Sequence, residues 1–140
     1  MRRHASRRGY VLDSRARTFY PTADFAKFDM IIGMDDQNIE ALKRAAINEE
    51  ERAKIFKMTD FCRKSTSYSE IPDPYYEGPQ GFELVLDLLE DALPDFIGIV
   101  WPIIDPDIWK LYSLKIFQTV FYLYNNAIFL YILNFDRILA

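Results

Sequence analysis

The sequence predicts an α/β protein built on a doubly wound parallel sheet. Short apolar runs alternate with amphipathic stretches in the order strand, helix, strand, helix, strand, loop, helix, which is typical of this class. Residues 30–34 are apolar without interruption, as in a strand that is covered on both faces. Residues 81–93 repeat apolar side chains at helical spacing. A chain of 140 residues is the size of one domain with its own core.

Composition excludes several classes of protein. The 17 basic and 21 acidic residues give a net charge of −4, which argues against a general nucleic-acid binder. Cys62 is the single cysteine and His4 the single histidine, so neither a disulfide nor a Cys/His metal site is expected. The Arg-rich start lacks the apolar segment of a secretory signal. These features predict a cytoplasmic protein that holds no metal.

Charged residues and a glycine predict the first two elements, a helix followed by a strand. Residues 1–8 contain four arginines and His4, and they are expected to form a helix with an exposed charged end. An arm that binds anions is the alternative for the same residues. Gly9 is expected to end this helix, and the apolar residues 10–12 are expected to form a strand.

A short helical turn is predicted to open at Pro21. Thr22 is its expected cap, and Phe25 and Phe28 fall on one face. The strand at residues 30–34 follows this turn in the sequence.

The strand at residues 30–34 is followed by residues 35–38, which are expected to cap a helix that runs to about Ala46. Ile39, Leu42 and Ala46 lie at inward spacing on this helix. Residues 48–52 are interpreted as a polar connection. Residues 54–58 form a third, less apolar strand, which is expected near an edge of the sheet.

The stretch most suggestive of chemistry is Ile-Pro-Asp-Pro-Tyr-Tyr at residues 71–76. Asp73 lies between two prolines, which restrain its backbone. A carboxyl group in a stiff loop beside Tyr75 and Tyr76 is a candidate proton donor at the rim of a pocket. A Pro-Asp-Pro turn whose tyrosines cover a core is the alternative. The helix that follows places four apolar residues on one face: Phe82, Val85, Leu86 and Leu89.

Five motifs occur together in one order and spacing. They are Ser-Arg-Ala-Arg at residues 14–17, the run at 28–35, Asn38, Asp-Pro-Tyr-Tyr at 73–76, and the run that contains Gly78, Gly81, Phe82 and Glu83. In this combination the chain resembles the low-molecular-weight protein tyrosine phosphatases over roughly residues 1–92. The resemblance implies a partial flavodoxin-like sheet with three of four strands, ordered 2-1-3-4 in the family.

The resemblance also implies an activity, which is the hydrolysis of phosphotyrosine through a phosphocysteine intermediate and without a cofactor. Asp73 matches the general acid that protonates the leaving phenol and later activates water. Tyr75 and Tyr76 match the aromatic wall beside the substrate ring. Proteins that carry phosphotyrosine are the implied partners. A positioned acid should contribute on the order of a hundredfold or more to such a reaction.

The chain departs from this family at its start. The family's nucleophile loop, C-x-x-x-x-x-R-[ST], follows a central first strand, and no C-x-x-x-x-x-R occurs in these 140 residues. Cys62 is therefore interpreted as a core or loop cysteine. We expect a chain that is inactive alone and marginally stable, unless something fills the place of the missing strand, because unpaired buried backbone groups each cost about 1–3 kcal/mol.

One alternative to an inactive phosphatase remains open, and two others are poorly supported by the sequence. The open one is a non-catalytic binding module, which would use Tyr75, Tyr76 and the Arg-rich residues 1–8 to contact a partner. The related arsenate reductases need several redox cysteines, whereas this chain has Cys62 alone. A flavodoxin-type cofactor protein would need a phosphate-binding loop after a first strand, and the sequence shows none.

Composition changes near Pro94, which predicts a partial phosphatase domain at 1–94 and a hydrophobic, aromatic-rich helical tail at 95–140. Residues 116–135, which begin at Ile116 and end at Phe135, have about the length of a membrane span, but amide side chains interrupt them. A membrane anchor is therefore not favoured. A translated non-coding segment and a helix packed on the sheet are the alternatives.

Overall fold

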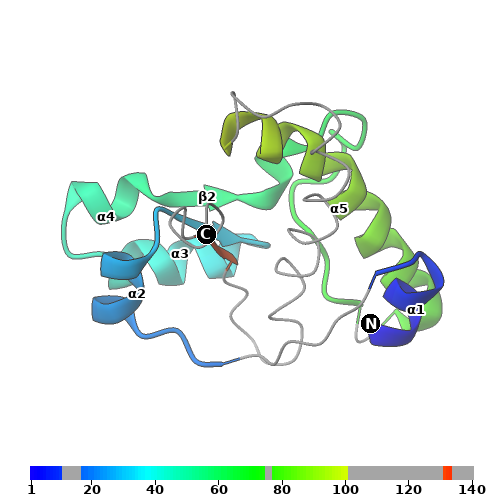
Figure 1. Cartoon of the computed structure of the whole chain (residues 1–140), viewed down its shortest axis with the longest axis horizontal. Helices are drawn as coiled ribbons and strands as arrows, with labels where there is room; N and C mark the ends of the chain where they lie inside the picture. Colours follow the sequence, from blue (N-terminus) through cyan, green and yellow to red (C-terminus); the bar gives the residue numbers. More distant parts are fainter. Residues whose placement is uncertain (11–16, 75–76, 101–130, 134–140) are drawn as a thin grey trace.

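The structure is a computed structural model that describes residues 1–10, 17–74, 77–100 and 131–133 (Figure 1). The α/β class is confirmed. Residues 11–12 of the first predicted strand lie outside the described residues. The elements are α1 (Arg2–Arg7), α2 (Pro21–Lys27), β1 (Met30–Gly33), α3 (Asp36–Ala45), α4 (Glu49–Ala53), β2 (Ile55–Lys57), the 3-10 helix η1 (Met58–Phe61), α5 (Gly78–Val100) and β3 (Tyr131–Leu133).

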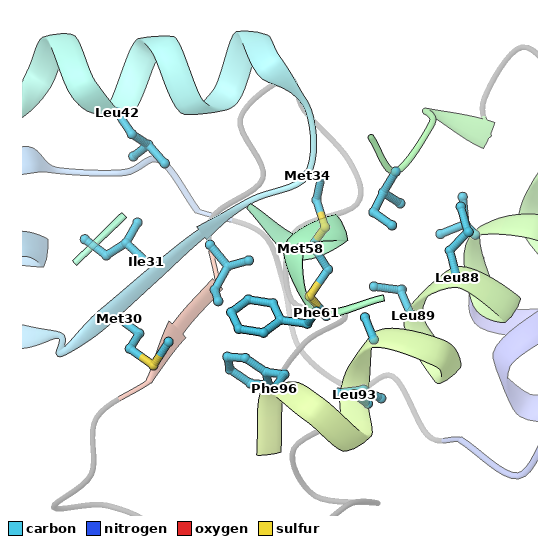
Figure 2. Packing of buried hydrophobic residues seen from close by; sticks show 14 of the residues in the cluster. Met30, Ile31, Met34, Leu42, Met58, Phe61, Leu88, Leu89, Leu93 and Phe96 are labelled. Atoms are coloured by element: carbon cyan, nitrogen blue, oxygen red, sulfur yellow. The ribbon is translucent and has the colours of Figure 1, made fainter. Parts of the chain in front are cut away.

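β1 is the middle strand of the sheet, whose order is β2-β1-β3. It pairs in parallel with β2, with Ile31 opposite Ile55, and all four of its residues are buried. Figure 2 shows β1 between α3 on one side and η1 with α5 on the other. The uninterrupted apolar run thus marks a strand covered on both faces, as predicted, and β2 lies at the predicted edge.

β3 was not predicted, because a short aromatic and aliphatic run fits a strand or a buried helix equally well. It pairs antiparallel with β1, with Ile31 opposite Ile132. The prediction of a helical tail is therefore wrong for Tyr131–Leu133. β3 also makes the sheet mixed, and it closes the edge of β1 that faces away from β2. The rest of the predicted tail beyond Val100 lies outside the described residues.

Two local predictions on the helices are corrected. The cap of α2 is Tyr20, not Thr22, and the amide of Tyr20 donates to Asp24 Oδ2 at 2.8 Å. Residues 48–52 form no polar connection but most of the helix α4, whose first turn is capped by the Asn48 side chain, 2.7 Å from the Glu51 amide. The cap of α3 is confirmed at Asp35, whose carboxylate accepts from the Asn38 amide at 2.6 Å.

α5 runs to Val100, seven residues beyond the predicted end at Leu93, and it includes Pro94. Phe96 explains the extension, because it is fully buried and packs edge-on against Phe61 at 5.2 Å between ring centroids (Figure 2). A proline inside a helix costs about 3 kcal/mol, and burying a phenylalanine contributes about 1.5–3 kcal/mol. The burial of Phe96 therefore offsets at least half of the cost of Pro94. The predicted inward face is confirmed, since Val85, Leu86 and Leu89 are buried.

α1 is docked onto α5 rather than exposed as a charged end (Figure 1). His4 is 6% exposed, stacks on Phe82, and lies 2.7 Å from Glu83 through Nδ1. Arg8 reaches three carboxylates of α5, at 2.6 Å for Glu83, 2.7 Å for Asp87 and 3.2 Å for Glu90. The interpretation of residues 1–8 as a solvated charge run is wrong for His4 and Arg8.

No helix among the described residues is long and apolar enough to cross a membrane. Of the candidate span at 116–135, the structure describes only β3, which is a strand. The remaining residues of that span lie outside the described part of the chain.

Candidate functional site

Asp73 is held in an exposed position between two buried neighbours. Ile71 is 3% exposed, Pro74 is fully buried, and the Asp73 side chain between them faces solvent. Two contacts with the rest of the fold, one on each side of Asp73, therefore add to the restraint that the two prolines impose on this loop. Tyr75 and Tyr76 lie outside the described residues, so their predicted place beside a substrate ring stays a prediction.

The first anchor ties the Asp73 loop to the carboxyl end of β1. The Ile71 amide donates to the Met34 carbonyl at 2.8 Å. Met34 is fixed in turn, because its own amide donates to Asn38 Oδ1 at 3.2 Å, and Asn38 is held by the Asp35 cap. The Asp73 loop thus lies at the carboxyl end of a parallel strand, where open α/β sheets place their ligand sites.

The second anchor is the contact between Pro74 and the start of α5. A Cβ atom on Gly81 would lie 3.2 Å from Pro74 Cα and 2.6 Å from Glu77 Cβ. Gly81 therefore lets the loop backbone lie directly on the first turn of the helix. Sequence reasoning noted this glycine as part of a motif but assigned it no role.

Together the two anchors present one carboxyl group to solvent from a fixed backbone. Such a group can donate a proton to a leaving oxygen and accept one from water. Among the described residues there is no cluster of three or more potential metal ligands. The role of Asp73 as a proton donor stays a prediction that this exposed placement agrees with.

Cys62 has the properties of a structural thiol. It is half-buried beside α5, and its Sγ lies 3.7 Å from the Leu88 carbonyl, to which the thiol can donate. Burial, together with the negative charge of Asp91, raises the pKa of Cys62 to about 11. The thiolate is the nucleophilic form of cysteine, and the raised pKa disfavours that form at neutral pH. The interpretation of Cys62 as a core or loop cysteine agrees with this environment.

Of the Ser-Arg-Ala-Arg motif, the structure describes Arg17. Its guanidinium makes two hydrogen bonds to the buried Asp24, at 2.8 and 2.6 Å. Burial alone would raise the pKa of Asp24, but the hydrogen bonds from Arg17 and the Tyr20 amide lower it overall. Arg17 thus fixes the entry to α2. Residues 14–16 lie outside the described part of the chain.

Glu83 joins the start of α5 to α1. Hydrogen bonds from His4 and Arg8 lower the pKa of Glu83. Its carboxylate lies two residues after Gly81, so α1 supports the same turn of α5 on which Pro74 rests. Sequence reasoning missed this link, although the pattern of His4 and Arg8, one helical turn apart, could have indicated a face that packs inward.

Comparison with known proteins gives a consistent result. A family model for low molecular weight phosphotyrosine protein phosphatases matches residues 1–101. A putative low molecular weight protein-tyrosine-phosphatase of Synechocystis is 43% identical over 86 residues, which cover 61% of this chain and 54% of that protein. The corresponding enzyme of Streptomyces coelicolor is 32% identical over 93 residues, covering 66% of this chain and 56% of that protein.

Solved structures agree with the sequence matches. A crystal structure of a protein tyrosine phosphatase from Entamoeba histolytica with Hepes in the active site is similar with a TM-score of 0.64 and 43% identity, covering 69% of this chain and 60% of that one. An apo structure of the Entamoeba histolytica phosphatase has a TM-score of 0.63 and 40% identity, with 74% and 71% covered. The chain spans about half the length of the curated relatives it matches, 54% and 56%.

Proposed function

Because the chain belongs to the low molecular weight phosphotyrosine protein phosphatase family, we propose that it carries the acid–base half of a phosphotyrosine phosphatase. Asp73 is the general acid in this proposal, and Tyr75 and Tyr76 flank the substrate ring. The observation that carries the proposal is the double anchoring of the Asp73 loop, by the Met34 carbonyl on one side and by Gly81 on the other. The proposed substrates are proteins with phosphotyrosine, and the proposed setting is the cytoplasm.

The proposed reaction has two steps. In the first, a cysteine thiolate attacks phosphorus, the bond to the phenolic oxygen breaks, and Asp73 gives its proton to that oxygen. In the second, the Asp73 carboxylate takes a proton from a water molecule that attacks the phosphocysteine, which releases phosphate and the thiolate. A phenolate is a poor leaving group, so protonation by a positioned acid lowers the barrier of the first step.

The nucleophile of this reaction is not assigned to any of the 140 residues, since no C-x-x-x-x-x-R motif occurs in them. Cys62 does not fit the role, because its environment raises its pKa to about 11. We propose that the chain by itself does not hydrolyse aryl phosphates. The acid loop becomes catalytic only together with a family nucleophile loop.

A fusion that places a family Cys-x-x-x-x-x-Arg loop ahead of residue 1 tests the role of Asp73. We expect the fusion to hydrolyse phenyl phosphate and p-nitrophenyl phosphate. In Asp73→Asn we expect kcat for phenyl phosphate to fall by about a hundredfold. The loss for p-nitrophenyl phosphate should be smaller, because nitrophenolate leaves without protonation.

The matched control is Asp60→Asn, which removes another exposed carboxyl group, in η1. This control should leave both rates unchanged. An equal loss for the two substrates in Asp73→Asn, or no loss at all, would contradict the assignment of Asp73.

A second candidate is a non-catalytic binding module of the same family. The lack of a C-x-x-x-x-x-R motif in these residues favours it. In that case, Tyr75 and Tyr76 contact a protein partner instead of a substrate. Capture of one defined partner, lost in Tyr76→Ala and kept in Asp73→Asn, would support the module over the catalytic role.

A further inference from the structure

The serine- and threonine-rich turn ahead of the Asp73 loop is not used by the proposed reaction. Residues 65–69 each carry a hydroxyl group. The turn closes where the Tyr68 amide donates to the Ser65 carbonyl at 3.2 Å, which leaves Thr66 and Ser67 at its exposed centre. Within the described residues, neither of these two side chains makes a hydrogen bond or an ion pair.

Both ends of this turn are tied to the fold. The Asp91 carboxylate on α5 accepts from the amides of Lys64 and Ser65, at 2.9 and 2.8 Å. The Thr59 hydroxyl donates to the Ser69 carbonyl at 3.0 Å. The centre of the turn can therefore open by breaking one hydrogen bond, from the Tyr68 amide to the Ser65 carbonyl. Extending the segment back to Arg63 also releases the amides of Lys64 and Ser65 from Asp91, but it does not require any helix to unfold.

Basic residues precede the centre of the turn. Arg63 and Lys64 lie three and two positions before Thr66. The Arg63 side chain is 61% exposed and pairs with Asp95 at the surface. A surface ion pair of this kind is weak, so Arg63 can exchange Asp95 for another carboxylate. An acidic groove that receives an extended segment complements this charge pattern.

We propose that this turn is a phosphorylation site, with Thr66 as the acceptor for a serine/threonine kinase whose substrate groove is acidic. The Thr66 oxygen attacks the γ-phosphorus of a nucleoside triphosphate held by the kinase. A bond forms between that oxygen and phosphorus, the bond to the nucleoside diphosphate breaks, and the hydroxyl proton passes to the kinase's base. The new phosphate lies close in sequence to Arg63 and Lys64, which can donate charge-assisted hydrogen bonds to it.

Ser6 provides a comparison within the same chain. Arg3 lies three positions before Ser6, and Ser6 is also exposed, so the basic residue and the hydroxyl have the same spacing. Ser6, however, lies in α1, which His4 and Arg8 hold against α5. Extending the chain at Ser6 requires that α1 unfold and leave α5. The structure therefore favours Thr66 over Ser6, although the local sequence does not.

The test uses the full chain, ATP and the catalytic subunit of the cyclic-AMP-dependent protein kinase, with the label located by mass spectrometry. We expect label on Thr66 and none on Ser6. Thr66→Ala should lose the label, and Arg63→Ala should be labelled severalfold more slowly with an unchanged circular dichroism spectrum. Synthetic peptides of residues 1–10 and 60–70 should both be labelled, since neither is folded.

Three results would each overturn the proposal. The first is equal label on Ser6 and Thr66 in the full chain, because conformation would then not select the site. The second is label that persists in Thr66→Ala, and the third is a labelling rate that is unchanged in Arg63→Ala. Thr22, which is exposed but has no basic residue in the three positions before it, should stay unlabelled throughout.

Discussion

Two single residues, Asp73 and Cys62, lie in opposite environments, the first exposed and the second half-buried. Asp73 is exposed on a loop that is anchored at both ends, and the proposed proton donor needs this access to solvent. Cys62 is half-buried between η1 and α5, where its charged form is disfavoured. The chain therefore exposes the residue that we propose as the proton donor, and the surroundings of Cys62 favour its neutral thiol.

Alkylation of Cys62 should report this difference. The environment raises its pKa from 9.0 to about 11, so the rate of reaction with iodoacetamide should rise with pH around a midpoint near 11. In denaturant the midpoint should fall toward the ordinary value. The neutral thiol's contribution to stability is complete below pH 9.0 and is lost as the pH rises through about 11. A midpoint below neutral pH in the folded chain would contradict the structural role of Cys62.

Two glycines of α5 should respond in opposite ways to the same change. Gly81→Ala forces a Cβ against Pro74 and Glu77 and should destabilise the chain by about 1–3 kcal/mol. Gly98 is the matched control, because a Cβ there meets no atom of the described residues within 4 Å, and Gly98→Ala should stabilise by about 0.5–1 kcal/mol. Urea denaturation measures both. Equal effects would show that Gly81 does not support the Asp73 loop.

At the scale of elements, α5 connects the site to the core. Its first turns contact Pro74 through Gly81 and bind α1 through Glu83. Its last turns place Phe96 against Phe61. One helix thus packs against the core through its last turns and against the Asp73 loop through its first turn.

Phe96→Ala tests whether the part of α5 beyond Pro94 belongs to the core. Phe96 is fully buried, so its truncation should cost about 3–5 kcal/mol. Such a loss is a large part of the stability of a domain this size, and thermal unfolding would measure it as a lower midpoint. Leu84→Ala, at a half-buried position of the same helix, should cost clearly less. A loss below that of Leu84→Ala would contradict the packing of this segment.

The sequence predicted the elements whose signals are local. The uninterrupted apolar run gave β1, and the cap at Asp35 gave the start of α3. The helix α4 was missed because its residues are all polar except Ala53, and its Asn48 cap was not recognised. The docking of α1 was missed because His4 and Arg8 find their partners 79 and 75 residues away, and a charge run read alone appears solvated.

The same distinction applies to the site. The flanking prolines and a family resemblance predicted Asp73 as the proton donor, and its role stays a prediction. The contacts that hold the loop could not be predicted in the same way. The hydrogen bond from Ile71 to the Met34 carbonyl joins segments that are distant in the chain. The contact of Pro74 with Gly81 depends on how closely two backbone segments approach.

In the molecule as a whole, β1 is the middle strand, and its backbone groups need a paired strand on each edge. The Ile31 amide donates to the Lys54 carbonyl on the β2 side at 2.8 Å. Backbone groups of successive residues point to opposite sides of a strand, so those of Ile32 face β3. A three-residue strand thus closes the edge whose exposure we expected to make the chain marginally stable.

Shortening the chain after residue 130 should open one side of β1 and leave the other paired. We expect amide hydrogen exchange to accelerate at Ile32, whereas Ile31 stays protected by β2. Each unpaired buried group costs about 1–3 kcal/mol, so the shortened chain should also unfold at lower urea concentration. Unchanged protection at Ile32 would contradict the pairing of β1 with β3.

Incubation of the purified chain of 140 residues with p-nitrophenyl phosphate shows whether the chain acts without a family nucleophile loop. We expect no hydrolysis above the buffer rate between pH 5 and pH 8, because the chain supplies Asp73 without an activated thiolate. Turnover accompanied by a phosphocysteine trapped at Cys62 would contradict the account.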